Sequence, residues 1–136
     1  MGLFFKSKED KLWDRANKFL INEDYDTAIR ISTECISQYP KCIEAYRVRG
    51  VAYKGKKDYD RAIADLTHVI ELETEKKTPF GIGYRYYIRS LVYSDMGDYE
   101  RAIADLTQSL KLDPNHCARE AAQKALAIAK AKLGKT

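Results

Sequence analysis

The sequence predicts an all-α fold: a short right-handed superhelical solenoid of three helix-turn-helix hairpins, followed by a C-terminal capping helix. The first observation behind this prediction is an internal repeat: the sequence of Asp58–Thr67 occurs again at Asp98–Thr107 with one conservative change. Asp24–Ile29 is a fainter copy about 34 residues before the first, a period typical of stacked helical repeats. Amphipathic helical patterns in each copy, and residues that start or stop helices at their ends, are the other two observations.

Each repeat contains two helical patterns, which the second repeat shows most clearly. Its first helix places Tyr46, Gly50 and Tyr53 on one face, at the i, i+4, i+7 spacing of an amphipathic helix. The second helix has the same kind of stripe, formed by Ala62, Leu66, Val69 and Ile70. Small residues stand where two helices must approach closely, and these are Ala16, Gly50, Ser90, Ala28, Ala62 and Ala102.

Capping and breaking residues mark the helix boundaries. Asp24, Asp58 and Asp98 each precede a second helix, where a carboxylate can accept free backbone N–H groups as an N-cap. Pro40 and Pro114 end the second helices of the first and third repeats, because proline cannot continue the helical hydrogen-bond ladder.

We predict a single domain over 1–136, because this length and apolar content suffice for one continuous core. Its parts are repeats at about 9–42, 43–76 and 83–116, an insert at about 77–82, and a capping helix at about 117–133. The insert is expected to lengthen the preceding helix and then to turn. The Ala-rich last helix is expected to cover the open core edge of the final repeat.

The order of small residue, tyrosine, turn, Asp-Tyr, Ala-Ile and a closing Asp-Pro-Asn at 113–115 resembles the tetratricopeptide repeat family over about 9–116. Leu12, Tyr46 and Tyr86 stand where the family usually has tryptophan. The resemblance implies a solenoid whose concave side is lined by the first helix of each repeat and holds another polypeptide.

Composition argues against nucleic-acid and membrane partners. The formal net charge is +4, and acidic residues are interleaved with Lys and Arg, so no basic face is expected. No apolar run approaches the roughly 20 residues that span a bilayer. Lys6 stands where a myristoylation signal has Ser or Thr, and we predict a cytoplasmic protein. Phe4 and Phe5 are expected to cover the edge of the first hairpin, with insertion into a membrane surface as the minor alternative.

The cysteines are predicted to be reduced thiols. Cys35, Cys42 and Cys117 form no metal-binding motif, so neither a metal nor a cofactor is expected. Two repeats separate Cys42 from Cys117, and Cys35 is expected to be buried on a second helix. No intramolecular disulfide is therefore predicted.

The sequence offers no catalytic constellation, and we predict that the chain is not an enzyme. His68 and His116 have no evident partner in the sequence. Asp65 and Asp105, which are not N-caps, are predicted to form ion pairs. Each lies on a second helix at the position that matches an arginine of the first helix, Arg49 or Arg89. These pairs are expected to clamp the second and third hairpins. In the first hairpin Arg15 faces Ile31 instead, so we expect that hairpin to be looser.

The first helices carry a second stripe opposite their core stripe, which is predicted to line the concave groove. An exposed stripe of this composition is expected to be shielded from water by a binding partner. Aromatic residues and arginine are also common hot spots in protein interfaces. The predicted peptide-binding groove consists of Trp13, Asn17, Leu20, Arg47, Val48, Val51, Lys54, Tyr84, Tyr87, Ile88 and Leu91.

The predicted function is a protein-protein interaction module or scaffold that holds a segment of an unknown protein or peptide in this groove. The alternative is a homo-oligomeric structural protein, such as a homodimer, that self-associates through the groove or the end cap.

The resemblance also raises a chaperone-binding function, which these residues do not support. Some members of the family hold the C-terminal carboxylate of heat-shock chaperones with Lys, Asn, Asn, Lys and Arg. The matching positions here are Trp13, Asn17, Val48, Tyr84 and Ile88. Only the first asparagine remains, and the cations that would bind a carboxylate are missing.

Overall fold

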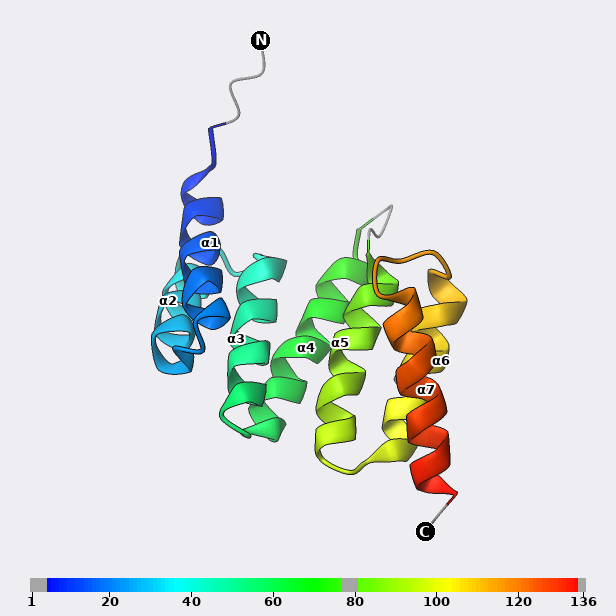
Figure 1. Cartoon of the computed structure of the whole chain (residues 1–136). Helices are drawn as coiled ribbons and strands as arrows, with labels where there is room; N and C mark the ends of the chain where they lie inside the picture. Colours follow the sequence, from blue (N-terminus) through cyan, green and yellow to red (C-terminus); the bar gives the residue numbers. More distant parts are fainter. Residues whose placement is uncertain (1–4, 77–80, 135–136) are drawn as a thin grey trace. The chain divides into compact units, whose positions relative to one another are not determined.

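A computed structural model gives the structure of residues 5–76 and 81–134. All regular secondary structure in these residues is helical, which confirms the predicted all-α fold (Figure 1). The helices are α1 (Lys8–Ile21), α2 (Tyr25–Gln38), α3 (Ile43–Gly55), α4 (Tyr59–Thr74), α5 (Ile82–Asp95), α6 (Tyr99–Leu112) and α7 (Arg119–Leu133).

The helices follow the predicted order of three hairpins and one further helix. The last helix, α7, begins at Arg119, two residues later than predicted. Residues 77–80 of the predicted insert lie outside the described residues, and Ile82 is already the first residue of α5. The helix before the insert, α4, has 16 residues, whereas α2 and α6 have 14 each. The exact repeat boundaries stay a prediction.

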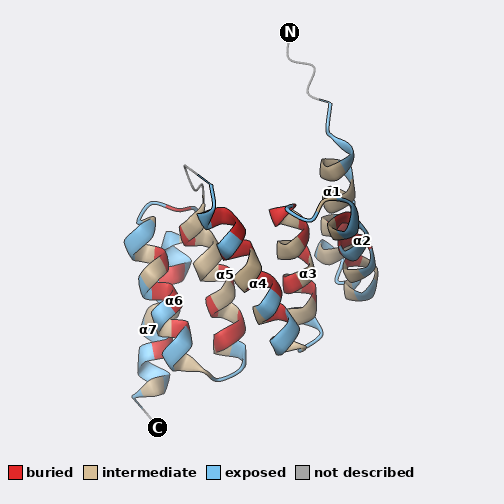
Figure 2. Ribbon diagram, turned by 180° about the vertical axis from the view of Figure 1, so that it is seen from behind, coloured by how far each residue is buried: buried red, intermediate tan, exposed pale blue. Residues whose placement is uncertain are grey.

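The chain forms two compact units, Met1–Asp65 and Leu66–Thr136, and α4 contributes to both. In the first unit α1 packs on α2, and α3 packs on both. Buried residues lie on the sides of the helices that face their neighbours (Figure 2). The main core cluster of this unit has no solvent exposure and consists of Ala16, Ala28, Ile31, Val48 and Ala52. The alanines at 16 and 28 confirm the predicted seam of small residues.

In the second unit α5 packs on α6, and α6 packs on α7. Ser90 and Ala102, which were predicted to lie at the helix contact, are fully buried. Ala122 and Ala129 of α7 are buried as well, so one face of this helix is packed while its other residues are mostly exposed. This arrangement agrees with the predicted capping role of α7.

Aspartate N-caps begin the second helices, as predicted. Asp24 Oδ1 accepts the backbone N–H of Thr27, and Asp98 Oδ1 accepts that of Arg101, both at 3.2 Å. Asp58 makes the equivalent contact at 3.4 Å. Each carboxylate satisfies a backbone donor that would otherwise lack a partner and lies at the positive end of the helix dipole.

The N-terminal segment differs from the prediction. Phe5 is 84% exposed, so it does not cover the first hairpin, and Phe4 lies outside the described residues. Polar contacts instead fix the start of α1. Ser7 and Asp10 form a reciprocal capping box, and Lys6 pairs with Asp14 at 2.8 Å.

One position in the hairpin turns is left-handed in all three hairpins. Glu23, Lys57 and Gly97 occupy it, with φ angles of 61°, 63° and 78°. This conformation costs a residue with a Cβ atom roughly 1–2 kcal/mol. Glycine adopts it without steric cost, although glycine also adds freedom to the unfolded chain.

We expect Lys57→Gly to raise the free energy of unfolding by about 0.5–1 kcal/mol, because the relief of strain exceeds the entropy that glycine adds to the unfolded state. Urea titration followed by circular dichroism measures the change. Gly97→Lys is the matched control and should lower the free energy of unfolding by a similar amount. A Lys57→Gly chain that unfolds at lower urea than the wild type would contradict this explanation.

Candidate functional site

The first unit presents partly buried side chains from α1 and α3 that form one polar and aromatic surface. Trp13 Nε1 donates to Asp10 Oδ1 at 3.2 Å. Arg47 Nε donates to Glu44 Oε2 at 2.7 Å, and its Nη2 reaches Asn17 Oδ1 at 3.4 Å. The last contact joins α1 to α3, so residues far apart in the sequence lie together. We call Trp13, Asn17, Arg47, Val51 and Lys54 the unit 1 face.

Two predicted groove residues belong to the core, and that part of the prediction was wrong. Val48 has no exposure and packs with Ala16, Ile31 and Ala52, whereas Ile88 is only 6% exposed. For Val48 the reason is that α3 contacts both α1 and α2, so its buried sector is wider than one hairpin requires. Leu20 is partly buried and also packs against the core cluster of the first unit.

The second unit carries the other predicted residues, Tyr84, Tyr87 and Leu91, on α5, and all three are partly buried. We call these three the unit 2 face. The rings of Tyr84 and Tyr87 have centroids 6.3 Å apart, and Tyr87 lies 6.4 Å from the His116 ring. These distances are typical of aromatic pairs that hold one another in place.

A cavity of about 280 Å³ lies beside Leu91, between α5 and α7. Its lining is mostly apolar and consists of Leu91, Ser94, Asp95, Tyr99, Ala125, Ile128, Ala129 and Lys132. Ile128 is 56% exposed, and the Lys132 ammonium lies 5.9 Å from the Tyr99 ring centroid. The sequence predicted a capping role for α7 and, in the homo-oligomer alternative, a surface for self-association. The spacing of Ala125, Ile128 and Lys132 on one helical stripe was the signal for its role in lining this cavity.

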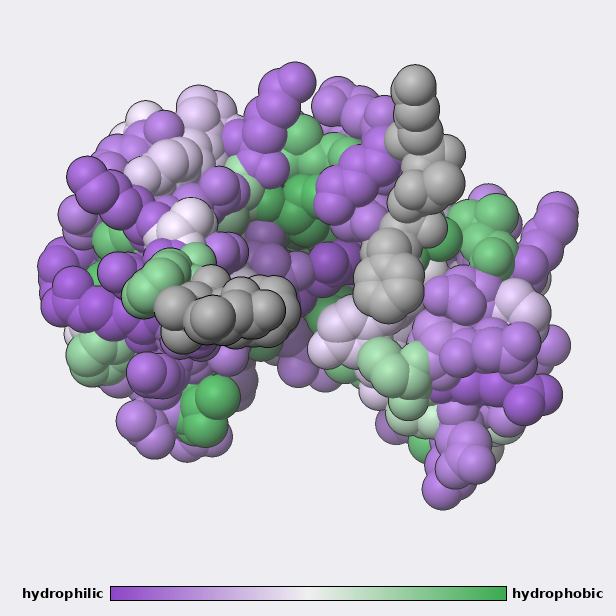
Figure 3. Space-filling view, turned by 90° about the horizontal axis from the view of Figure 1, so that it is seen from above, coloured by the Kyte–Doolittle hydropathy of each residue, from purple (hydrophilic) through white to green (hydrophobic). Residues whose placement is uncertain are grey.

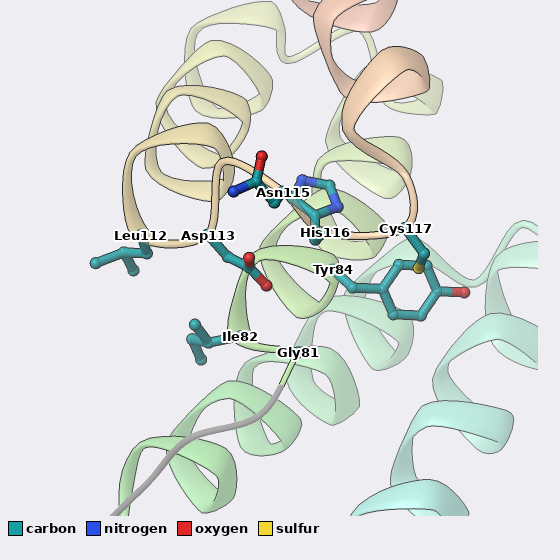
Figure 4. Close-up of a pocket in the computed structure, with 8 residues that line it drawn as sticks. All are labelled: Gly81, Ile82, Tyr84, Leu112, Asp113, Asn115, His116 and Cys117. Atoms are coloured by element: carbon teal, nitrogen blue, oxygen red, sulfur yellow. The ribbon is translucent and has the colours of Figure 1, made fainter.

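A larger cavity, of about 570 Å³, lies where the α6–α7 connection passes the start of α5 (Figure 4). The close-up shows Asp113, Asn115 and His116 on that connection and Gly81 and Ile82 at the start of α5. Tyr84, Leu112 and Cys117 complete the lining.

His116 has partners that the sequence did not reveal. It is 7% exposed, its Nδ1 accepts the backbone N–H of Ala118 at 3.1 Å, and its Nε2 lies 2.9 Å from Ser109 Oγ. Ser109 in turn donates to the carbonyl of Gly83 at 2.6 Å. With Nδ1 as acceptor, Nε2 carries the proton and donates to Ser109. The imidazole therefore does not act as a base toward this hydroxyl, and the network ties α5, α6 and the loop together.

The predicted ion pairs are present and are bidentate. Arg49 donates to both carboxylate oxygens of Asp65 at 2.8 Å, and Arg89 donates to those of Asp105 at 2.8 and 2.7 Å. The hydrogen bond to Asp65 raises the pKa of Arg49 above its usual value. At the equivalent place in the first hairpin, Ile31 is fully buried. The paired carboxylates are structural.

Metal-binding clusters, membrane-spanning helices and the polarity of the surface bear on the kind of site that the described residues can form. Residues 5–76 and 81–134 contain no group of three or more His, Cys, Asp or Glu side chains placed to hold a metal ion. None of their helices combines the length and apolar character that crossing a membrane requires. The surface in Figure 3 is largely hydrophilic, with separate hydrophobic patches, which agrees with the interleaved charges of the sequence.

Comparison with known proteins identifies the family. The tetratricopeptide repeat model matches residues 43–76 and 84–116. The small glutamine-rich tetratricopeptide repeat-containing protein 2 of Saccharomyces cerevisiae is 34% identical over 68 residues, which are 50% of this chain and 20% of that protein. This chain therefore spans about a fifth of that relative's length. The chain belongs to the tetratricopeptide repeat family.

Solved structures share the fold at low sequence identity. The first repeat domain of Spaghetti (RPAP3), bound to the HSP90 peptide SRMEEVD, has a TM-score of 0.79 at 23% identity, with 98% of this chain and 99% of that one covered. The TPR2B domain of yeast Sti1 has a TM-score of 0.81 at 18% identity over 92% and 98%. The Sgt2 domain of Aspergillus fumigatus has a TM-score of 0.80 at 20% identity over 96% and 82%.

Proposed function

We propose that this chain is an interaction module that binds a segment of a partner protein on the unit 1 face and the unit 2 face. One observation carries the proposal. Large aromatic and aliphatic side chains on the first helices remain partly exposed, although other side chains of the same helices already fill the core. Tyr87 and Val51 are of this kind, whereas the neighbouring Val48 is fully buried. Surface of this composition is stabilised when a ligand covers it.

The two faces differ in chemistry. On the unit 1 face, Glu44 and Asn17 hold the Arg47 guanidinium in place, so a ligand can use it with little further loss of side-chain freedom. Trp13 adds a large ring beside these polar groups. An extended segment can place a backbone carbonyl near Arg47 or Asn17 and an apolar side chain on the Trp13 ring.

The unit 2 face offers a better site for an apolar anchor. The rings of Tyr84 and Tyr87 pack near each other, and Leu91 lines the cavity of about 280 Å³ beside α7. An aliphatic or aromatic side chain of the partner fits this lining, with Lys132 and Asp95 near its edge. We therefore infer that the partner segment contributes a bulky apolar residue here.

Relatives support a polypeptide as the class of ligand. The solved complex of Spaghetti (RPAP3) contains the HSP90 peptide SRMEEVD, and that of the second domain of human RPAP3 contains the HSP70 peptide SGPTIEEVD. The residues on this chain favour a different peptide. Of the five positions compared with the carboxylate clamp, Val48 and Ile88 are buried, and Trp13, Asn17 and Tyr84 bear no positive charge.

We predict that the peptides SRMEEVD and SGPTIEEVD bind this chain with a dissociation constant weaker than about 1 mM, because the five compared clamp positions carry none of the cations that would pair with a terminal carboxylate. Isothermal titration calorimetry with each peptide measures the affinity. An amidated copy of each peptide is the matched control and should behave like the free acid. Micromolar binding that depends on the free carboxylate would overturn this part of the proposal.

Selection from a displayed library of random linear peptides tests the function itself. The expected result is a set of peptides with bulky apolar residues that bind one to one and compete with one another. Light scattering on the chain without peptide addresses self-association, which the comparisons do not support. A peptide-free dimer together with the absence of any selected peptide would contradict the proposal. A cytoplasmic location and the lack of catalysis stay predictions.

A further inference from the structure

Cys35 and Cys42 form a buried pair of thiols, and this pair bears on the prediction from the sequence that no intramolecular disulfide forms. Cys35 has no exposure and Cys42 is 4% exposed. Both belong to one core cluster of the first unit, together with Ala45. The pair lies at the connection between α2 and α3, and Trp13 of the unit 1 face packs against it.

Backbone turns bring the two cysteines together. Cys35 lies in the last turn of α2, where its carbonyl accepts the backbone N–H of Tyr39 at 2.8 Å. The carbonyl of Tyr39 accepts the N–H of Cys42 at 3.0 Å, and Cys42 is the N-cap of α3. The chain thus reverses direction between the two residues. The two cysteines pack in the same core cluster, and the Cys35 thiol also lies 3.9 Å from the Glu9 carbonyl.

From this proximity we propose that Cys35 and Cys42 are a modification site, at which hydrogen peroxide oxidises the two thiols to a reversible intramolecular disulfide. A disulfide requires a Cα separation of roughly 4.4–6.8 Å, and packing in one core cluster brings the two cysteines close together. The loop closed by the new bond runs only from the last turn of α2 to the N-cap of α3.

The reaction balances with the peroxide as the only oxidant. The Cys35 thiolate attacks one peroxide oxygen, the O–O bond breaks, and the leaving hydroxide takes a proton to become water. The sulfenic acid on Cys35 is then attacked by the Cys42 sulfur, the S–O bond breaks, and a second water leaves. Two thiols lose two protons and two electrons in total, and one peroxide is reduced to two waters.

The surroundings explain why the pair is stable when reduced and selective when oxidised. Burial raises the pKa of both thiols, so only a small fraction of the attacking thiolate is present at neutral pH. Once a sulfenic acid forms, the adjacent thiol reacts with it before a second peroxide can enter the core. Cys117 is exposed. It serves as an internal comparison, because a sulfenic acid there has no neighbouring thiol within reach and proceeds to the sulfinic acid.

The test uses the full chain with Cys117→Ser, treated with hydrogen peroxide at pH about 9, where thiolate is more abundant. The expected product has lost two hydrogens by intact mass, gives a Cys35–Cys42 linkage after digestion, and returns to the starting mass with a phosphine reductant. Trp13, the only tryptophan, packs against the pair, so its emission should change with oxidation and recover on reduction.

A matched variant, Cys42→Ser with Cys117→Ser, should give no linkage and no reversible change in emission. The wild-type chain in the same experiment provides the dose that fully oxidises Cys117. Sulfinic acid on Cys35 or Cys42, or a pair that stays fully reduced at that dose, would overturn the proposal.

Discussion

Removing one carboxylate, with Asp105→Ala, is expected to lower the free energy of unfolding by about 3 kcal/mol, the lower end of the range for breaking a buried ion pair. The Arg89 side chain is 17% exposed and that of Asp105 is 6% exposed, so water cannot fully replace the lost partner. Burial alone would lower the pKa of Arg89, but the hydrogen bond and charge of Asp105 reverse this and raise it. Thr67 alone cannot replace that partner, because its hydroxyl accepts a single hydrogen bond from Arg89 at 3.1 Å.

The first hairpin suggests the control for this prediction. It has no such pair, and Ile31 is fully buried at the position equivalent to Asp105. The double variant Arg89→Met with Asp105→Ile removes both charges and should recover all but about 1 kcal/mol of the loss. Urea unfolding followed by circular dichroism gives both values. A double variant as unstable as Asp105→Ala would mean that packing volume, and not the unpaired guanidinium, causes the loss.

A second large effect is expected for Gly83→Ala, which should lower the free energy of unfolding by about 3 kcal/mol through overpacking. A Cβ atom at this position would lie 2.6 Å from Asp113 Cβ, 2.8 Å from the Ser109 carbonyl oxygen and 2.9 Å from His116 Cδ2. One of these is a backbone atom that cannot rotate away. The shift of α5 would also break the hydrogen bond from Ser109 to the Gly83 carbonyl.

Thermal unfolding measures this effect, and a loss of that size in a chain of this length lowers Tm by about 10 °C. Gly134→Ala is the matched control, because its Cβ would meet only the Lys130 carbonyl oxygen at 3.4 Å and that of Ala131 at 3.8 Å. It should melt within about 2 °C of the wild type. If Gly83→Ala has the same Tm as the control, the packing of α5 does not require glycine at position 83.

The sequence was sufficient for the features that depend on short-range patterns. Aspartate before each second helix predicted the N-caps, and the repeated arginine and aspartate predicted the bidentate pairs, because these contacts depend on fixed offsets within one hairpin. Pro40 and Pro114 likewise predicted where the second helices end, since α2 ends at Gln38 and α6 ends at Leu112.

Features that depend on contacts between successive hairpins could not be predicted in the same way. Val48 was placed on the ligand side because a two-helix hairpin leaves that side open, but α1 and α2 both cover it. The pairing of Cys35 with Cys42 depends on how the chain reverses between α2 and α3, and that of Ser109 with His116 on the course of the loop after α6. Neither turn has a sequence signature as strong as a proline or an N-cap.

The central claim, that the unit 1 and unit 2 faces bind the partner, is tested most directly by titrating one selected peptide into face variants. Tyr87→Ala and Val51→Asp should each weaken binding by about 2 kcal/mol, or about thirtyfold in dissociation constant, because each removes an apolar contact from a face. Both should change the free energy of unfolding by about 1 kcal/mol or less. Ala104→Asp places the same charge on an exposed position of α6, and it should leave affinity unchanged. Variants that unfold would show that Tyr87 and Val51 are core residues. Variants that fold and bind as tightly as the wild type would show that the ligand lies elsewhere.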